Sequence, residues 1–256
     1  MANRNAQDGR ATKAERKDEA RRQRLELERK MARARRNRKI SIVAAVLVVA
    51  GVAVFAMTRP EQKSATSGRA AGLLTTSDSQ AAAAGCTGVA DVGPYQPEDQ
   101  DETHIGAEGG PAEMPALSSY PSQPPASGPH GDSTLAAGVY TDPPPIEPLI
   151  HSLEHGAAIV WYDPDASGTA LADIQDFYRD ADVGDRVIVA PYDYPDEGEA
   201  GSLPAGTSMA LVSWHHVETC TDVSLAAAFG FTARYAFPTF EGEDYLGNAP
   251  EPGAAL

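Results

Sequence analysis

The sequence predicts an α+β (or α/β) domain with a mixed sheet of about three to four strands and two to three helices. Between residues 148 and 240, short apolar runs typical of buried strands alternate with stretches of helical periodicity. Before residue 148 the chain is rich in Pro and Gly and carries neither signal. An uncharged run near the N-terminus adds a single transmembrane helix to this prediction.

Each regular element is predicted from its own pattern of apolar residues. Three short apolar runs indicate strands: residues 157–162, 186–191 and 208–214. Two further segments indicate helices: residues 169–181, which begin with a Thr that can cap a helix, and residues 221–236. The order strand, helix, strand, strand, helix is typical of a small α+β or α/β domain.

The other parts of the chain lack such periodicity. Residues 58–85, rich in Ala, Ser, Thr and Gly, predict a flexible stalk before an outer domain at residues 86–240. The first part of that domain, up to about residue 148, is expected to be either disordered or an irregular segment that something specific holds in place. The acidic residues 193–206 predict a loop, and residues 241–256 predict a loose C-terminal tail.

Charge is distributed very unevenly along the 256 residues, which carry 36 Asp and Glu against 21 Lys and Arg. Residues 1–39 have a net charge of +9, residues 40–57 have no charged side chain, and residues 58–256 have a net charge of −24. This arrangement excludes a simple cytosolic globule. It also argues against a nucleic-acid partner for the acidic part, because phosphate contacts need clustered Lys and Arg.

Residues 40–57, ISIVAAVLVVAGVAVFAM, predict a helix that spans the lipid bilayer once. A cleaved signal peptide is the alternative, but the basic region of 39 residues is too long for one, and residues 57–60 are a poor cleavage site. The basic tail, residues 1–39, is then cytoplasmic, where it attracts anionic lipid headgroups, and the acidic domain lies outside the cell membrane. A nucleic-acid-binding arm is the other interpretation of this tail.

Two cysteines, Cys86 and Cys220, lie on the predicted outer side of the membrane. In an oxidising compartment such a pair usually forms a disulfide, which here would join the start of the irregular segment to the end of the third predicted strand. A thiolate metal ligand or a redox pair is the alternative. The sequence has no C-x-x-C motif, and this favours the disulfide.

The sharpest motif is HSLEHG at residues 151–156. Pro148 suits the first turn of a helix and the final glycine of the motif suits its end, so a helix is predicted over residues 148–155. On such a helix His151 and His155 lie on one face, about 6 Å apart at Cβ, and can bind one metal ion. On a strand they would be about 13 Å apart and could not share an ion.

Zinc or copper needs further ligands, and the irregular segment offers two more histidines. The predicted metal site comprises His104, His130, His151 and His155. Glu147 lies one helical turn before His151, and Glu154 points partly away from the histidine face. Both are candidates for carboxylates that support the ligands. His215 and His216, at the end of the third predicted strand, are interpreted as surface residues.

Two other functions stay open. The motif also spells H-x-x-E-H, the inverted zinc-peptidase pattern, in which Glu154 would be the general base for zinc-bound water. Those peptidases place the motif on a long helix, whereas here a proline precedes it and a strand follows at once, so a metal-dependent hydrolase is the weaker alternative. The other alternative is a metal-free cell-envelope interaction module that docks through the Pro- and Tyr-rich segment. The sequence alone leaves open whether the protein is an enzyme.

Several short strings extend the pattern around the histidines. They are His104-Ile105, Tyr120-Pro121, PPASGPH at residues 124–130, Gly138-Val139-Tyr140, HSLEHG, Ala190-Pro191-Tyr192, Cys220 and Ala249-Pro250-Glu251. Over about residues 86–252 the chain thereby resembles the bacterial family catalogued as domain of unknown function 3105, except that Ala126 stands where the pattern usually has Thr. The resemblance implies a single-span, outward-facing, actinobacterial protein without an established activity. It supports attention to the four histidines of the predicted site.

Overall fold

The computed structural model describes residues 68–256. The predicted basic tail at residues 1–39, the transmembrane helix at residues 40–57 and the first ten residues of the stalk lie outside this part. Within residues 68–256, no helix is both long and apolar enough to cross a bilayer.

A six-stranded mixed sheet forms the centre of the described part, in the order β1-β6-β5-β3-β4-β2. The strands are β1 (Ala90–Asp91), β2 (Gly138–Val139), β3 (Ala158–Tyr162), β4 (Val187–Pro191), β5 (Met209–Ser213) and β6 (His216–Cys220). Strand β4 runs parallel to β3 and β2, and the pairs β3–β5, β5–β6 and β6–β1 are antiparallel. The α+β class is confirmed, but the predicted number of strands is too low, because the two edge strands have only two residues each and the pattern of β6 is broken by polar residues.

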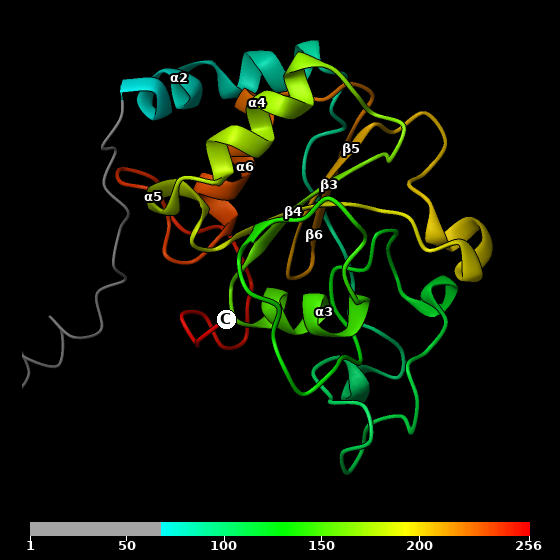
Figure 1. Cartoon of the computed structure of the whole chain (residues 1–256). Helices are drawn as coiled ribbons and strands as arrows, with labels where there is room; N and C mark the ends of the chain where they lie inside the picture. The colour runs from blue at the N-terminus through cyan, green and yellow to red at the C-terminus, as the bar shows by residue number, and fades with distance from the viewer. Residues whose placement is uncertain (1–67) are drawn as a thin grey trace, which may run out of the picture. The chain divides into compact units, whose positions relative to one another are not determined.

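Helices cover both faces of this sheet, as Figure 1 shows. The α-helices of residues 68–256 are α2 (Gly68–Ala83), α3 (Ile146–Glu154), α4 (Thr169–Tyr178), α5 (Ala181–Gly184) and α6 (Leu225–Tyr235). The 3₁₀ turns are η1 (Glu98–Gln100), η2 (Leu117–Ser119) and η3 (Pro195–Gly201). Helices α2, α4 and α6 pack on one face, and α3 packs on the other together with the irregular segment before it. The predicted two to three helices are therefore too few as well.

The central strands are apolar at every position because both of their faces are buried. In β3, Val160 faces the core under α2, α4 and α6, while Ile159 and Trp161 face the core under α3. Strands β4 and β5 alternate in the same way, which is the pattern expected of a sheet with helices on both sides. This burial explains why short apolar runs located β3, β4 and β5 in the sequence.

Strand β6 was not predicted from the sequence. For this reason His215 and His216 were wrongly interpreted as surface residues. The chain turns after β5 and returns antiparallel, with His216 opposite Ser213. His215 occupies the turn with φ of 61°, and His216 is buried in β6 at 5% exposure rather than on the surface. The turn residues Trp214 and His215 lack the Asn-Gly or Gly signature that usually reveals a hairpin.

Residues 68–83 form helix α2 instead of the flexible stalk that their composition predicted. Ala70 and Ser77 are buried against the rest of the domain. A Cβ atom at Gly230 of α6 would lie 2.4 Å from the Cβ of Ser77, so the two helices approach very closely. The small residues that suggested a linker are needed here for helix packing.

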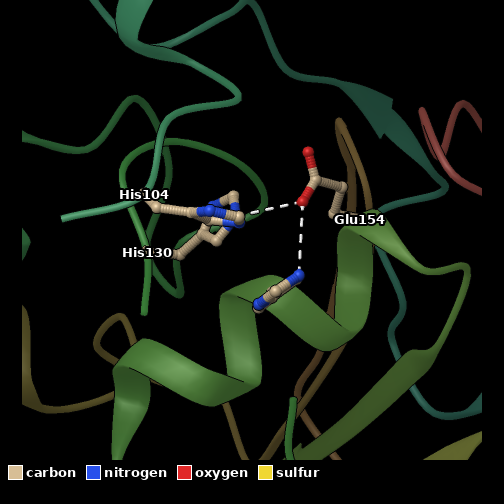
Figure 2. A group of neighbouring side chains, drawn as sticks. His104, His130 and Glu154 are labelled. Atoms are coloured by element: carbon tan, nitrogen blue, oxygen red, sulfur yellow. Dashed lines mark ion pairs between the residues drawn. The ribbon is translucent and has the colours of Figure 1, made fainter. Parts of the chain in front are cut away.

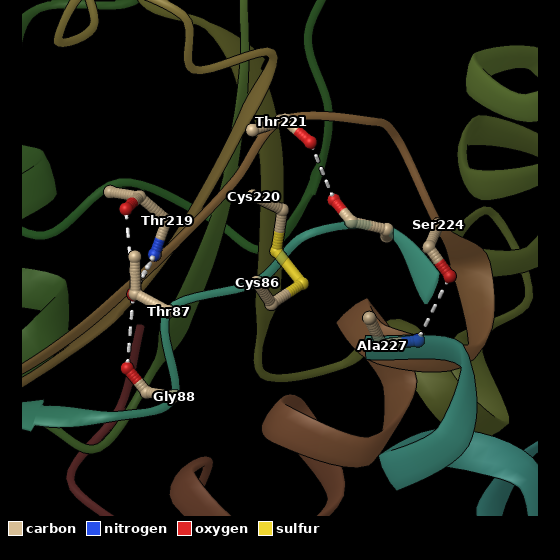
Figure 3. Close-up of a disulfide and its surroundings, with 9 residues drawn as sticks. Cys86, Thr87, Gly88, Thr219, Cys220, Thr221, Ser224 and Ala227 are labelled. Atoms are coloured by element: carbon tan, nitrogen blue, oxygen red, sulfur yellow. Dashed lines mark hydrogen bonds between the residues drawn. A yellow bond between two sulfur atoms is a disulfide. The ribbon is translucent and has the colours of Figure 1, made fainter. Parts of the chain in front are cut away.

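The predicted disulfide between Cys86 and Cys220 is present (Figure 3). It joins the residues after α2 to the end of β6, across a sequence separation of 134 residues. Beside it, the Thr87 amide donates to the carbonyl of Thr219 at 2.9 Å, and the Thr219 amide donates to Oγ1 of Thr87 at 3.2 Å. The disulfide thus fastens helix α2 to the sheet.

The C-terminal residues 241–256 have no regular secondary structure, as predicted, but they are not loose. The Glu251 amide donates to the carbonyl of Glu154 at 3.0 Å, and the Gly253 amide donates to the carbonyl of His155 at 3.2 Å. Arg186 holds the same segment by donating to the carbonyl of Ala254 at 2.6 Å. The tail is ordered because the last carbonyls of α3 need donors that the helix itself cannot supply.

Candidate metal centre

Helix α3 supplies two of the side chains at the centre of the site. It begins at Ile146 after three prolines and ends at Glu154, close to the predicted range of 148–155. His151 and Glu154 are separated by three residues and so share one face of the helix. Each is only 6% exposed.

The irregular segment supplies the other two side chains. His104 and His130 pair as an isolated parallel bridge, in which the His130 amide donates to the carbonyl of Thr103 at 3.1 Å and the Ile105 amide donates to the carbonyl of His130 at 2.8 Å. This pairing brings two histidines that are 26 positions apart in the sequence side by side over α3. The segment is therefore an ordered, irregular structure, which was one of the two predicted alternatives.

The Ser-Gly-Pro-His string at residues 127–130 is explained by the backbone that it builds. Gly128 has φ of 115°, and a Cβ there would lie 2.7 Å from the ring of Tyr120. The Tyr120 hydroxyl donates to the carbonyl of Pro129 at 2.6 Å, and the Ser127 hydroxyl donates to Oδ1 of Asp101 at 2.7 Å. Only glycine fits this position, and the string orients the imidazole of His130.

Three imidazoles and one carboxylate converge at this place. One possible ligand atom from each of His104, His130, His151 and Glu154 lies within 4.8 Å of all the others. The ring centroids of His104, His130 and His151 form a nearly equilateral triangle with sides of 5.0, 4.8 and 4.8 Å. Figure 2 shows His104, His130 and Glu154 pointing toward one another.

The distances between these atoms are close to those of a metal site. Oε2 of Glu154 lies 3.0 Å from Nε2 of His130 and 3.7 Å from Nε2 of His151. With metal–ligand bonds of about 2.0–2.2 Å, neighbouring ligand atoms of a tetrahedral ion are roughly 3.3–3.6 Å apart. The first distance is slightly shorter than this range and the second is slightly longer. Small side-chain shifts would therefore suffice to bind an ion.

Hydrogen bonding leaves the relevant nitrogen of His130 available. Its Nδ1 lies 2.8 Å from the carbonyl of Gly128 and therefore carries a proton, so the neutral ring has its lone pair on Nε2. Nε2 of His130 and Nδ1 of His151 are both buried and have no hydrogen-bond partner. Buried polar atoms without partners are uncommon in native proteins. An ion at this place would accept the lone pair of the neutral His130 ring and one nitrogen of His151.

Electrostatics at the site couple a buried carboxylate to the imidazoles around it. Burial opposes ionisation of the Glu154 carboxyl, but a hydrogen bond and charge attraction from the protonated His130 ring outweigh burial and hold the pKa of Glu154 below its ordinary value. Burial lowers the pKa of His151 to about 4, with repulsion from His130 in the same direction. Within residues 68–256, the ion-pair contacts of Glu154 are to His130 and His151, and none is to an Arg or Lys.

Two residues of the predicted site lie outside this group. The ring of His155 touches that of His151, with centroids 4.5 Å apart, but its Nδ1 donates to the carbonyl of Ala255 at 2.7 Å and its Nε2 faces Glu251 at 3.5 Å. Glu147 lines a separate pocket at the start of α3. In place of His155, the structure brings Glu154 to the histidines.

Asp101 organises the site from outside it, and no sequence signal distinguished it from the acidic residues around it. Its carboxylate accepts from the Tyr95 amide at 2.5 Å, from Ser127 and from Nε2 of His215 at 2.7 Å. Its carbonyl accepts from the Gly128 amide at 3.1 Å. Burial opposes its ionisation, but the hydrogen bonds prevail and lower its pKa. His215, predicted as a surface residue, thus helps to hold the Ser-Gly-Pro-His string.

Comparison with protein families supports the resemblance seen in the sequence. Residues 113–246, more than half of the chain, match the family described as protein of unknown function, DUF3105. The chain belongs to this family. Its DUF3105 region contains His130, His151 and Glu154, while His104 precedes it. The searches of curated proteins and of solved structures found no match.

Proposed function

We propose that this DUF3105 domain binds one transition-metal ion, zinc or copper, through His104, His130, His151 and Glu154. The observation that carries the proposal is the approach of Glu154 Oε2 to His130 Nε2. The two buried atoms are 3.0 Å apart, and one possible ligand atom each of His104 and His151 lies within 4.8 Å of both. Two ligands of a common ion lie in this relationship. Imidazole and carboxylate are suitable donors for zinc, and imidazole is suitable for copper.

The role that best fits this donor set is structural. Three imidazoles and a carboxylate complete a tetrahedral coordination without water, as in closed zinc sites. The ligands come from helix α3 and from two separate points of the irregular segment. An ion would therefore fasten His104 and His130 to the helix and replace the secondary structure that this segment lacks.

A metal-dependent hydrolase has less support. Its mechanism would require Glu154 as a general base near a metal-bound water. Here the carboxylate lies among the ligand atoms themselves, which leaves it no separate position as a base. A metal-free interaction module would give no role to the convergence of three imidazoles and one carboxylate.

We further propose that residues 40–57 anchor this domain in the cell membrane, with the basic residues 1–39 in the cytoplasm against anionic lipid headgroups. The uncharged run supports a membrane span, and the charge asymmetry supports the orientation. The disulfide between Cys86 and Cys220 fits an oxidising compartment on the outer side.

Elemental analysis of the full chain tests the metal proposal. The chain should be purified with its disulfide intact and without a His tag, beside the variants Glu154→Ala and His155→Gln. We expect about one equivalent of zinc or copper in the unmodified chain and in His155→Gln, and a large loss in Glu154→Ala. An unmodified chain that contains no metal, and takes up neither ion on titration, would contradict the proposal. Retention by Glu154→Ala with loss in His155→Gln would restore the site predicted from the sequence.

A further inference from the structure

A second feature of the domain lies between helices α2 and α6 and strand β6. These elements enclose a cavity of about 140 Å³, on the opposite face of the sheet from α3. Glu218 of β6 lies on this side because it alternates with Val217, which faces the core under α3. The cavity is too small for an extended peptide and large enough for one linear side chain.

Glu218 is a buried carboxylate without a cationic partner. It is 7% exposed, and within residues 68–256 it forms no ion pair with Arg or His. Burial raises its pKa, a backbone hydrogen bond from Gly88 opposes this, and the neighbouring Asp78 adds to the increase. Buried carboxylates are seldom left without a cation.

Part of the lining of the cavity is apolar and exposed. Among residues 68–256, two large apolar side chains are exposed to solvent, Val89 at 38% and Leu246 at 48%. Both line this cavity, together with the aromatic ring of Tyr235. An apolar rim above a buried carboxylate suits a ligand with a hydrocarbon stem and a cationic end.

The arginine that lines the cavity, Arg234, already pairs with other carboxylates. Nε of Arg234 lies 2.6 Å from Glu243, and its Nη1 lies 3.3 Å from Asp78. Arg234 therefore shares its charge between two acids and leaves Glu218 uncompensated. The surrounding domain is also strongly acidic, which attracts a positively charged partner.

We propose that this cavity binds the side chain of a lysine from a protein partner, with the ammonium group at Glu218 and the methylene groups against Val89, Leu246 and Tyr235. The long stem and compact charge of lysine match apolar rim residues above the buried Glu218, and Asp78 adds a second carboxylate to the lining. The cavity has no residue in common with the metal group of His104, His130, His151 and Glu154. This inference therefore stands or falls independently of the proposed metal function.

Ligand-detected saturation-transfer NMR on the full chain tests the proposal with N-acetyl-lysine-N′-methylamide as the probe. The norleucine analogue provides the same stem without the charge. We expect binding of the lysine probe to weaken at least tenfold in Glu218→Gln and several-fold in Leu246→Ser. The norleucine analogue should bind at least tenfold more weakly than lysine. Glu108→Gln, an exposed carboxylate outside the cavity, is the matched control and should leave binding unchanged.

Three outcomes would overturn the proposal: no binding of the lysine probe, equal binding of the norleucine analogue, or equal binding of lysine to Glu218→Gln and the unmodified chain. Equal binding to the variant would assign the effect to the overall negative charge of the domain. Leu246→Ser keeps the test valid if Glu218→Gln does not fold, because Leu246 is an exposed rim residue whose replacement should preserve the core.

Discussion

Nε2 of His130 and Oε2 of Glu154 lie 3.0 Å apart, although one belongs to an irregular segment and the other to the last residue of helix α3. Both side chains are almost fully buried. Backbone hydrogen bonds from Gly131 and Leu135 to the carbonyls of Glu147 and Pro148 join these two parts near the start of the helix, and this contact joins them at its end. The proposed ion at this place would connect them, so its removal should lower the stability of the whole domain.

Chelation should lower the stability of the domain. An ion that binds the folded state at one hundred times its Kd adds about 2.7 kcal/mol to the free energy of unfolding. We expect the melting temperature of the metal-loaded chain to fall when EDTA is added, and to recover when the metal is restored. The variant Glu154→Ala should melt at a similar temperature with and without EDTA. An unmodified chain that is indifferent to EDTA would count against a structural ion.

Helix packing at Gly230 should be sensitive to a single methyl group. Gly230→Ala places a Cβ 2.4 Å from that of Ser77 and must separate α2 from α6. We expect the variant to lose about 1–3 kcal/mol, the usual cost of overpacking. In α2, Gly72→Ala is the matched control, since its Cβ would meet no atom within 4 Å, and it should gain roughly 0.5–1 kcal/mol. Urea unfolding measures both. Equal effects would mean that α2 does not dock on α6.

The disulfide should contribute more to the free energy of unfolding than the contacts around its sulfur atoms do. Replacing Cys86 and Cys220 together by Ala removes a cross-link over 134 residues. The expected loss is roughly 2–5 kcal/mol in the free energy of unfolding, chiefly because the unfolded chain gains freedom. Urea unfolding of the double variant and of the oxidised chain measures the difference. The metal content should be retained, because neither sulfur is a ligand, and its loss would contradict that separation.

The carboxylate of Asp101 should make stability depend on pH. Its pKa is lowered in the folded state, so its contribution is complete above the ordinary carboxyl pKa of about 3.9 and is lost as pH falls through the folded pKa. With EDTA present, the unmodified chain should be more stable than Asp101→Asn at pH 6, and the difference should shrink between pH 5 and pH 3. The exposed Asp99→Asn is the control. A difference in stability that stays constant across this pH range would rule out the ionised Asp101 carboxylate as the source of the extra stability.

Much of the fold could be predicted from the sequence because the central strands are buried on both faces. Their continuous apolar runs located β3, β4 and β5 without knowledge of their partners. Strand β6 could not be recognised in this way, since His216 and Glu218 interrupt its pattern and its turn lacks a glycine. Helix α2 was missed because close packing and flexibility favour the same small residues.

Three of the four residues that the structure brings together, His104, His130 and His151, were among the predicted ligands. The spacing of His151 and His155 fits a helical face, but so does the spacing of His151 and Glu154. Whether His155 or Glu154 joins His151 at the site depends on where helix α3 ends. It ends at Glu154, and His155 turns to hydrogen-bond the C-terminal tail through the carbonyl of Ala255. That contact spans 100 residues and has no local signal in the sequence.

Anomalous X-ray diffraction at the zinc and copper edges, from crystals of the purified chain, tests the central claim most directly. We predict one anomalous peak per chain at the edge of the bound metal, about 2.0–2.2 Å from one atom each of His104, His130, His151 and Glu154. A peak at His155 instead of Glu154, or the absence of any peak from protein that has been supplied with both metals, would contradict the account.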